Sequence, residues 1–179
     1  MIQRIQSLFL LGSLIVLLTA AFAPIITLEG EFISDRDSQA IDRTVNVKVS
    51  GFQIETDIAD LKELYEPELE SQLPAVFPLG LGILAVVILT GFIIINFTDR
   101  KRQMRFIMIS LILHALLIIA SIFYGYAVAE VVAVYNDFFN IQYFNWGLIA
   151  IAFSAILSFV ARIYIKKDEE LVKSVDRIR

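Results

Sequence analysis

The chain has 179 residues, of which 58% are hydrophobic, with a mean hydropathy of +0.73 and a formal net charge of −4. Soluble domains contain roughly 45–50% apolar residues, so this composition indicates a membrane protein. Because the chain contains no cysteine, disulfides, thiolate nucleophiles and cysteine-ligated metals are excluded.

The apolar residues are concentrated in four blocks. Each block is close to the roughly 20 residues that an α-helix needs to cross the hydrocarbon core of a bilayer. The blocks span about residues 8–26, 76–97, 106–127 and 143–165. We therefore predict an all-α membrane protein with one domain, residues 1–179, folded as a four-transmembrane-helix bundle.

The first block follows Arg4 and contains Ala21-Phe22-Ala23, which resembles the cleavage site of a signal peptide. However, the block is longer than the usual apolar core of a signal peptide, and Pro24 would directly follow the cut. We therefore expect an uncleaved first transmembrane helix.

The longest connection, residues 29–73, is strongly acidic. It contains twelve acidic and four basic residues and has a net charge of −8. Such a surface repels anionic lipid head groups, so we expect this loop to stand away from the membrane.

The same loop contains a pattern typical of β-structure. Val47 and Val49 alternate with polar residues, and the alternation resumes at Phe52 and Ile54. A turn at Ser50-Gly51 would pair Val49 with Phe52 and Val47 with Ile54, with all four side chains on one face. We predict a β-hairpin here.

A short helix is predicted directly after the hairpin. Asp57 is a typical N-cap, an apolar stripe follows, and Pro67 would end the helix. The stripe consists of Ile58, Leu61, Leu64 and Tyr65. A lone hairpin is marginally stable in water. The predicted fold is therefore a helix bundle with a small outer β-hairpin plus a short helix packed together in the first loop.

The distribution of basic residues predicts the orientation, because Lys and Arg near span ends stay on the cytoplasmic side. The second connection, TDRKRQMR, contains four basic residues and one acid, and the segment from Arg162 onward contains six basic residues. The third connection, up to Gln142, contains Glu130 and Asp137 and no basic residue. We expect both termini in the cytoplasm and residues 29–73 outside.

His114 is the single histidine and lies near the middle of the third block. An ionisable group at that depth is a candidate for a proton pathway. The other blocks offer no acid or base at similar depth, so we favour a neutral imidazole that is hydrogen-bonded to a neighbouring helix. The available hydroxyl groups are those of Ser110, Ser121, Ser154 and Ser158.

Two further patterns concern the fourth block. Ala150, Ser154 and Ser158 recur every four positions and predict a close helix–helix contact. Aromatic residues gather where the block begins and predict an interfacial belt. These are Phe138, Phe139, Tyr143, Phe144 and Trp146.

The C-terminal segment, residues 166–179, is hydrophilic but carries a narrow apolar stripe. We expect the fourth helix to continue as, or turn into, a short amphipathic cytoplasmic helix that binds a partner protein. The candidate partner-binding residues are Leu171, Val172, Val175, Asp176, Arg177, Ile178 and Arg179.

No enzyme signature stands out in the sequence. We find no Ser/His/Asp arrangement on one side of the membrane, no glycine-rich phosphate loop and no metal-ligand cluster. We therefore expect no catalytic residue, cofactor, metal or nucleic-acid partner. The leading hypothesis is a non-catalytic accessory or scaffold subunit of a larger envelope complex in the bilayer. The alternatives are a small transporter or channel component, based on His114, and a membrane enzyme.

The two ends of the chain carry a family resemblance. MIQRIQ at Met1–Gln6 and KDEELVKSVDRIR at Lys167–Arg179 resemble the recurring ends of a family of four-span bacterial membrane proteins, a domain of unknown function. The resemblance implies a bacterial inner (cytoplasmic) membrane and no particular activity.

Overall fold

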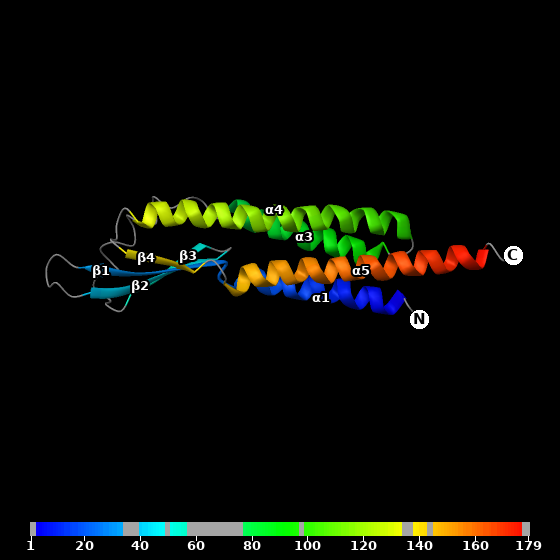
Figure 1. Ribbon diagram of the computed structural model, residues 1–179, viewed down its shortest axis with the longest axis horizontal. Helices are drawn as coiled ribbons and strands as arrows, with labels where there is room; N and C mark the ends of the chain where they lie inside the picture. The colour runs from blue at the N-terminus through cyan, green and yellow to red at the C-terminus, as the bar shows by residue number, and fades with distance from the viewer. Residues whose placement is uncertain are drawn as a thin grey trace. The chain divides into compact units, whose positions relative to one another are not determined.

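The computed structural model describes residues 3–33, 40–48, 51–56, 77–96, 99–133, 138–142 and 145–176. The helices are α1 (Gln3–Phe22), α3 (Phe77–Ile95), α4 (Arg100–Ala133) and α5 (Trp146–Asp176) (Figure 1). The strands are β1 (Ile26–Ile33), β2 (Ala40–Lys48), β3 (Gly51–Thr56) and β4 (Phe138–Gln142).

The chain divides into two units, which are described separately. The helical unit consists of Met1–Thr19, Leu81–Ile118 and Ala150–Arg179. The sheet unit consists of Ala20–Gly80 and Ile119–Ile149.

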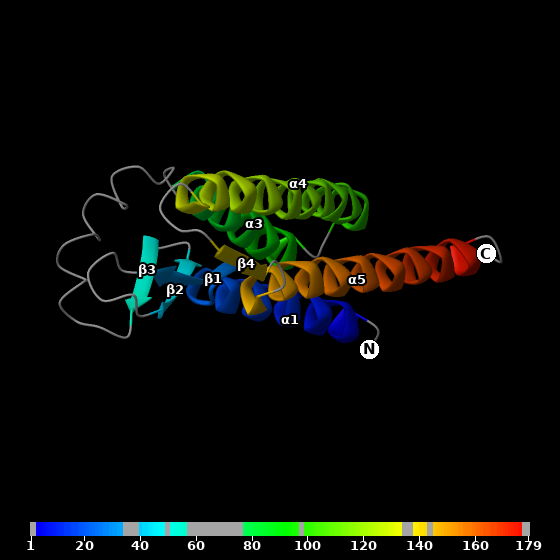
Figure 2. The ribbon, with the colours of Figure 1, turned by 60° about the vertical axis from the view of Figure 1, so that its left-hand side comes forward.

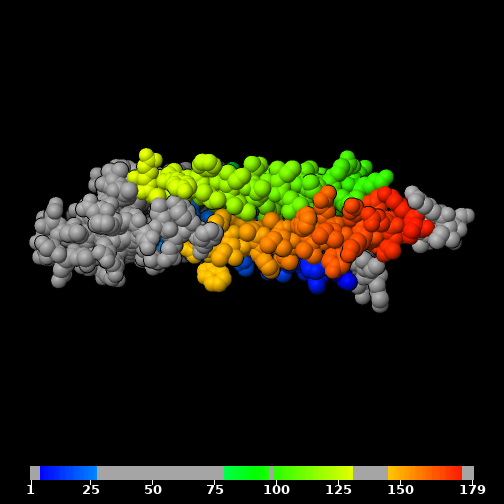
Figure 3. Space-filling view, viewed as in Figure 1, coloured from blue at the N-terminus to red at the C-terminus, as the bar shows by residue number. Residues whose placement is uncertain are grey.

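Within the helical unit, segments of all four helices run side by side, as both ribbon views show (Figures 1 and 2). Its apolar core combines residues from every helix: Leu10, Ile93, Ile107, Ala161 and Ile165. In the space-filling view α4 and α5 lie next to each other on the visible face (Figure 3). The helical blocks thus form a bundle as the sequence predicts.

The surface of the helical unit is apolar and part of its interior is polar. Exposed apolar side chains include Leu8, Leu11, Ile15, Ile88, Phe92, Ile112, Leu116, Phe153 and Ile156. Buried polar side chains include Gln6, Ser13, Thr90, Gln103, Ser110, His114, Ser154, Ser158 and Asp168. Water favours the opposite arrangement, whereas hydrocarbon leaves polar groups to find partners inside the protein. The unit is therefore compatible with a membrane environment.

Three of the described helices are long and apolar enough to cross a membrane: Ile5–Phe22, Arg100–Glu130 and Trp146–Ser174. The apolar helix Leu79–Ile95, in the predicted second span, is shorter. Among the described residues, three of the four predicted spans are thus long enough to cross a membrane, and the second is shorter. α4 also begins earlier than its apolar block, because the basic residues from Arg100 onward already adopt helical structure.

The sheet unit contains a four-stranded antiparallel sheet with the order β3-β2-β1-β4. β1 pairs Ile26 with Val47 of β2 on one side, and Thr27 with Gln142 of β4 on the other. β4 uses Phe138–Gln142 as an edge strand, a segment whose aromatic residues the sequence assigned to an interfacial belt.

The predicted lone hairpin is therefore wrong in extent and in register. β2 and β3 are neighbours in a larger sheet, with Lys48 opposite Gly51 and Val47 opposite Phe52. The predicted pairs placed Val49 opposite Phe52, a shift of two residues on β2. A two-residue shift preserves the side-chain alternation, so the apolar pattern alone cannot distinguish the two registers. The predicted short helix at Asp57 lies outside the described residues.

The beginning of α5 packs tightly against the connection between α1 and β1. The Gly147 N–H donates to the Pro24 carbonyl oxygen at 3.0 Å. A Cβ atom at Gly147 would lie 2.7 Å from that oxygen and 3.1 Å from the Ile25 Cα. The Asn145 side chain accepts from the Trp146 N–H and donates to the Thr27 hydroxyl. Only glycine fits this approach of two backbones.

We expect Gly147→Ala to destabilise the protein by about 1–3 kcal/mol, because the added Cβ must displace backbone rather than a flexible side chain. Gly91→Ala is the matched control, since a Cβ at Gly91 meets nothing within 4 Å. Alanine also favours a helix interior over glycine by about 1 kcal/mol. Circular dichroism melts in mild detergent measure both Tm values, and equal losses would contradict the close contact.

Candidate functional site

The centre of the helical unit contains a buried polar cluster that joins three helices. Ser13 of α1, His114 of α4 and Ser154 of α5 are each fully buried. His114 Nε2 lies 3.0 Å from Ser154 Oγ, and Ser154 Oγ lies 2.8 Å from Ser13 Oγ. Ser158, one turn further along α5, lies 2.9 Å from Ser13 Oγ. We call these four residues the serine–histidine cluster.

The geometry of the serine–histidine cluster defines its protons. His114 Nδ1 lies 2.7 Å from the Ser110 carbonyl oxygen, which only accepts, so Nδ1 carries the hydrogen and donates. His114 Nε2 then accepts from the Ser154 hydroxyl. Ser13 can donate to Ser154 Oγ and accept from Ser158, which gives one unbroken chain of donors and acceptors. This chain of donors and acceptors requires a neutral imidazole with its hydrogen on Nδ1.

The two central serines have a second set of partners. The Ser13 hydroxyl lies 3.0 Å from the Ser154 carbonyl oxygen, and the Ser154 hydroxyl lies 3.1 Å from the Ser13 carbonyl oxygen. Each hydroxyl can therefore rotate between two acceptors on the facing helix. Such close contact requires small side chains on both helices. Ser13 provides one on α1, and Ser154 and Ser158 provide two on α5.

The sequence analysis expected a hydroxyl or carbonyl on a neighbouring helix as the partner of His114, and Ser154 of α5 is such a hydroxyl. The Ser110 carbonyl, on α4 itself, and the role of Ser13 were missed. The available signal was weak: Ser13 lies beside Gly12 and is one of two hydroxyl residues, with Thr19, in an otherwise apolar block. Ser121, also considered as a partner, is buried in the sheet unit.

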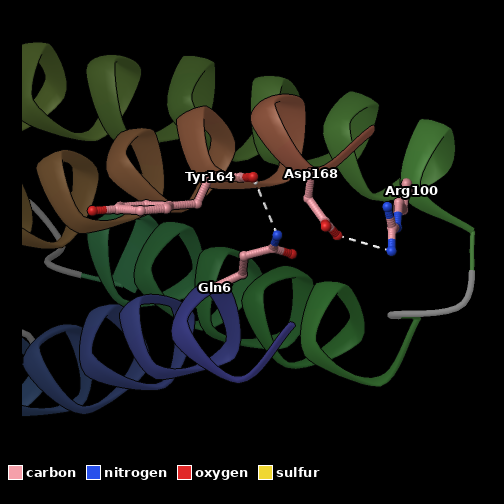
Figure 4. Close-up of polar contacts among 4 residues, drawn as sticks. All are labelled: Gln6, Arg100, Tyr164 and Asp168. Carbon is pink, nitrogen blue, oxygen red and sulfur yellow. Dashed lines mark hydrogen bonds and ion pairs between the residues drawn. The ribbon is translucent and has the colours of Figure 1, made fainter. Parts of the chain in front are cut away.

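A second polar group lies at the end of the helical unit where α4 begins (Figure 4). Arg100 Nη2 of α4 lies 2.8 Å from Asp168 Oδ2 of α5. The contact is ionic, because no hydrogen bond of good geometry reaches Asp168 Oδ2 within the described residues. Nearby, Gln6 Nε2 of α1 donates to the Tyr164 carbonyl oxygen at 3.2 Å. Gln6 and Asp168 lie near the two ends of the chain, and both are buried.

The two polar sites lie at defined positions along antiparallel helices. Fourteen residues separate Arg100 from His114 on α4, and fourteen separate Ser154 from Asp168 on α5. At 1.5 Å per residue this places the sites about 21 Å apart along the bundle. The core cluster of Leu10, Ile107 and Ile165 belongs to the same unit.

The last two turns of α5 continue beyond the Arg100–Asp168 pair, and the ribbon views show this end projecting past α1 and α4 (Figures 1 and 2). Leu171 is 54% exposed and Val172 is 47% exposed. Lys173 Nζ lies 2.8 Å from Glu169 Oε1, which stabilises this helical segment. We call residues 169–176 the α5 extension.

The other predicted partner-binding residues are described only in part. Val175 and Asp176 belong to α5, whereas Arg177, Ile178 and Arg179 lie outside the described residues. Among the side chains that the structure describes, no three His, Asp or Glu residues lie close enough together to hold a metal ion.

Comparison with known families gives one result. The family model described as a domain of unknown function, DUF4293, matches residues 2–178. The chain belongs to the DUF4293 family. No curated protein matches it. The match covers both polar sites and the α5 extension, so they are parts of one DUF4293 domain.

In this DUF4293 protein we expect Ser154→Ala to cost about 0.6–2 kcal/mol, since it removes a donor to His114 and a partner of Ser13. Ser158→Ala is the matched control, because Ser158 contributes one hydrogen bond to Ser13, and its cost should be smaller. Unfolding in mixed detergent micelles measures both free energies. A larger loss for Ser158→Ala would show that Ser154 is not the centre of the cluster.

We expect Arg100→Gln to destabilise the DUF4293 domain by about 1–3 kcal/mol, because it leaves Asp168 buried and uncompensated. The side chains of this pair are 24% and 11% exposed. In the control pair, Arg102 and Asp99 are 66% and 50% exposed, so Arg102→Gln should cost about 0–1 kcal/mol. Adding Asp168→Asn to Arg100→Gln should recover stability. Additive losses in this double-mutant cycle would contradict the coupling.

Proposed function

We propose that the chain is a four-span integral protein of a bacterial inner membrane, with both termini in the cytoplasm and residues 29–73 outside. The apolar surface of the helical unit supports the insertion. The basic residues near Arg100 and Lys166 support the orientation, because such residues stay on the cytoplasmic side. In this proposal the shorter α3 also spans the bilayer. The basic residues that follow it, from Arg100 onward, extend their long side chains to the interface and so compensate for the short apolar segment.

Within that membrane, the proposed role is a non-catalytic accessory or scaffold subunit that binds another envelope protein through its cytoplasmic end. The observation that carries this proposal is the α5 extension with its exposed Leu171 and Val172. The extension reaches about 12 Å beyond the Arg100–Asp168 pair, at 1.5 Å per residue. Apolar side chains on a projecting, charged helix are typical of a helix that docks into a groove.

The charges on the extension indicate the chemistry of the partner. Glu169 pairs with Lys173, and Glu170 lies 3.9 Å from Lys166. Both ion pairs are local, and residues 166–176 together carry three lysines and four acids, which gives a net charge of −1. The complementary surface is therefore an apolar groove with a mixed polar rim, rather than an acidic or basic patch.

A small transporter or channel component is the second candidate function. It is favoured by the continuous chain from Ser158 through Ser13 and Ser154 to His114, in which hydroxyl rotation would reverse the direction of the donors. In the accessory-subunit proposal the same chain clamps α1, α4 and α5 together. In the structural role, the Ser154 hydroxyl is needed only for the stability of the bundle. In proton conduction, the hydroxyl hydrogens of the serines would have to exchange along the chain.

We expect the double variant Leu171→Ser and Val172→Ser to reduce recovery of a stoichiometric partner at least tenfold, because it removes the apolar surface of the extension. Native-level affinity purification in mild detergent, with mass spectrometry, measures this recovery. The Tm should stay unchanged, since both side chains are exposed. Glu170→Gln and Ser174→Ala, on the same turns, are the matched controls.

Two outcomes would contradict the accessory role. One is a wild-type chain purified without any stoichiometric protein, which would favour transport through the serine–histidine cluster. The other is a partner that the double variant retains in full, which would place the interface elsewhere. Loss of the bundle itself in the double variant would make the extension a structural element.

A further inference from the structure

An open groove of about 660 Å³ lies on the helical unit between α4 and α5. Its α4 lining consists of Lys101, Met104, Arg105, Met108 and Ile109. These positions follow helical spacing of three and four residues and form a single stripe along α4. Arg162 of α5 completes the lining. Half of the six residues are basic, and the other half are apolar.

The three basic residues of the groove differ from their neighbours in having no ion-pair partner among the residues that the structure describes. Arg100 pairs with Asp168 at 2.8 Å, and Arg102 pairs with Asp99 at 3.0 Å. Lys101, Arg105 and Arg162 form no ion pair with any acid in the described ranges. Glu169 acts electrostatically on Lys101, but its carboxylate is bonded to Lys173. The groove therefore contains three cations that form no ion pair within the described part of the chain.

The charge and the apolar surface are arranged by depth. Arg105 is five residues inward from Arg100 on α4, and Arg162 is six residues inward from Asp168 on the antiparallel α5. Both guanidinium groups thus start about 8–9 Å inward from the end pair, at 1.5 Å per residue. Lys101 lies one turn nearer the end of the bundle, and Met108 and Ile109 lie about one turn deeper. From its end inward, the groove changes from basic to apolar.

We propose that this groove binds one anionic phospholipid of the cytoplasmic leaflet. Its phosphate contacts Lys101, Arg105 and Arg162, and an acyl chain lies along Met104, Met108 and Ile109. Arginine side chains match phosphate oxygens in a bidentate geometry, and flexible methionine adapts to a mobile chain. Basic pockets between helices on this side of a membrane are suited to acidic head groups. The inference rests on the membrane insertion proposed above and is independent of the α5 extension.

The apolar half of the groove distinguishes a phospholipid from a free phosphate. Inorganic phosphate satisfies the three cations but leaves the exposed Met108 and Ile109 uncovered. A zwitterionic lipid covers these side chains, but its own ammonium group compensates its phosphate. An anionic phospholipid meets both requirements at once.

The experiment uses the full chain purified in mild detergent and titrated with phosphatidylglycerol, with native mass spectrometry to count bound lipids. Phosphatidylcholine with the same acyl chains and inorganic phosphate are the comparison ligands. Each basic residue near a membrane surface contributes about fivefold in affinity, so the triple variant Lys101→Gln, Arg105→Gln and Arg162→Gln should bind phosphatidylglycerol roughly 100-fold more weakly.

A matched triple variant controls for net charge. Arg102→Gln, Lys166→Gln and Lys167→Gln remove the same charge from exposed positions outside the groove, at the same end of the unit. This control should change the affinity for phosphatidylglycerol by less than about threefold. The three control residues lie outside the groove, so salt screens their attraction for the bound phosphate. An equal loss in both triple variants would overturn the site.

A second pair of variants tests the apolar half without changing charge. Met108→Trp should fill the groove and weaken phosphatidylglycerol binding, whereas Ile15→Trp, on the exposed surface of α1, should not. Equal binding of phosphatidylcholine, or full competition by inorganic phosphate, would overturn the proposal. The purified chain is used without a partner protein, so a failed lipid experiment leaves the accessory role untouched, and the reverse also holds.

Discussion

The helical unit depends on hydrogen bonds that hydrocarbon makes obligatory. Lipid tails are as apolar as leucine, so burying Leu10 or Ile107 against another helix gains little over leaving it in lipid. A buried hydroxyl or imidazole has no such alternative, since an unpaired polar group in a bilayer is costly. The serine–histidine cluster therefore selects which helices meet and in which register. His114 connects α4 to α5 through Ser154, and Ser13 connects α1 to α5.

The Arg100–Asp168 pair extends this constraint to the end of the unit. Because fourteen residues separate the pair from the cluster on both α4 and α5, a register that satisfies one contact satisfies the other. Two fixed contacts between antiparallel helices define the axial register of one helix relative to the other. Gln6 gives α1 a comparable anchor at the Tyr164 carbonyl. These contacts give a physical reason why polar residues near both ends of the chain are buried.

Sequence patterns predicted what depends on local composition. Apolar blocks located the helices. The stripe at Leu171 and Val172 predicted a helix that either continues the fourth block or turns away from it, and the structure shows the continuous α5. β1 was missed because it begins within the first apolar block and ends in the acidic loop, so neither pattern covers it. Burial of Ser13 and Asp168 was also missed, since it depends on helices 141 and 68 residues away in the chain. Hydropathy marks where a helix crosses lipid, and not where it begins.

The basic residues at the end of the helical unit show why a count of charges is insufficient. Orientation rules treat Arg100, Arg102 and Arg105 alike, because each lies near the end of a span. The structure distinguishes them by their partners: one is matched to a buried acid, one to an exposed acid, and one to no acid among the described residues. The first contributes to the fold and the second adds little stability. The third retains its attraction for an anion, and in the proposed lipid binding this attraction is concentrated in the groove rather than spread over the basic surface.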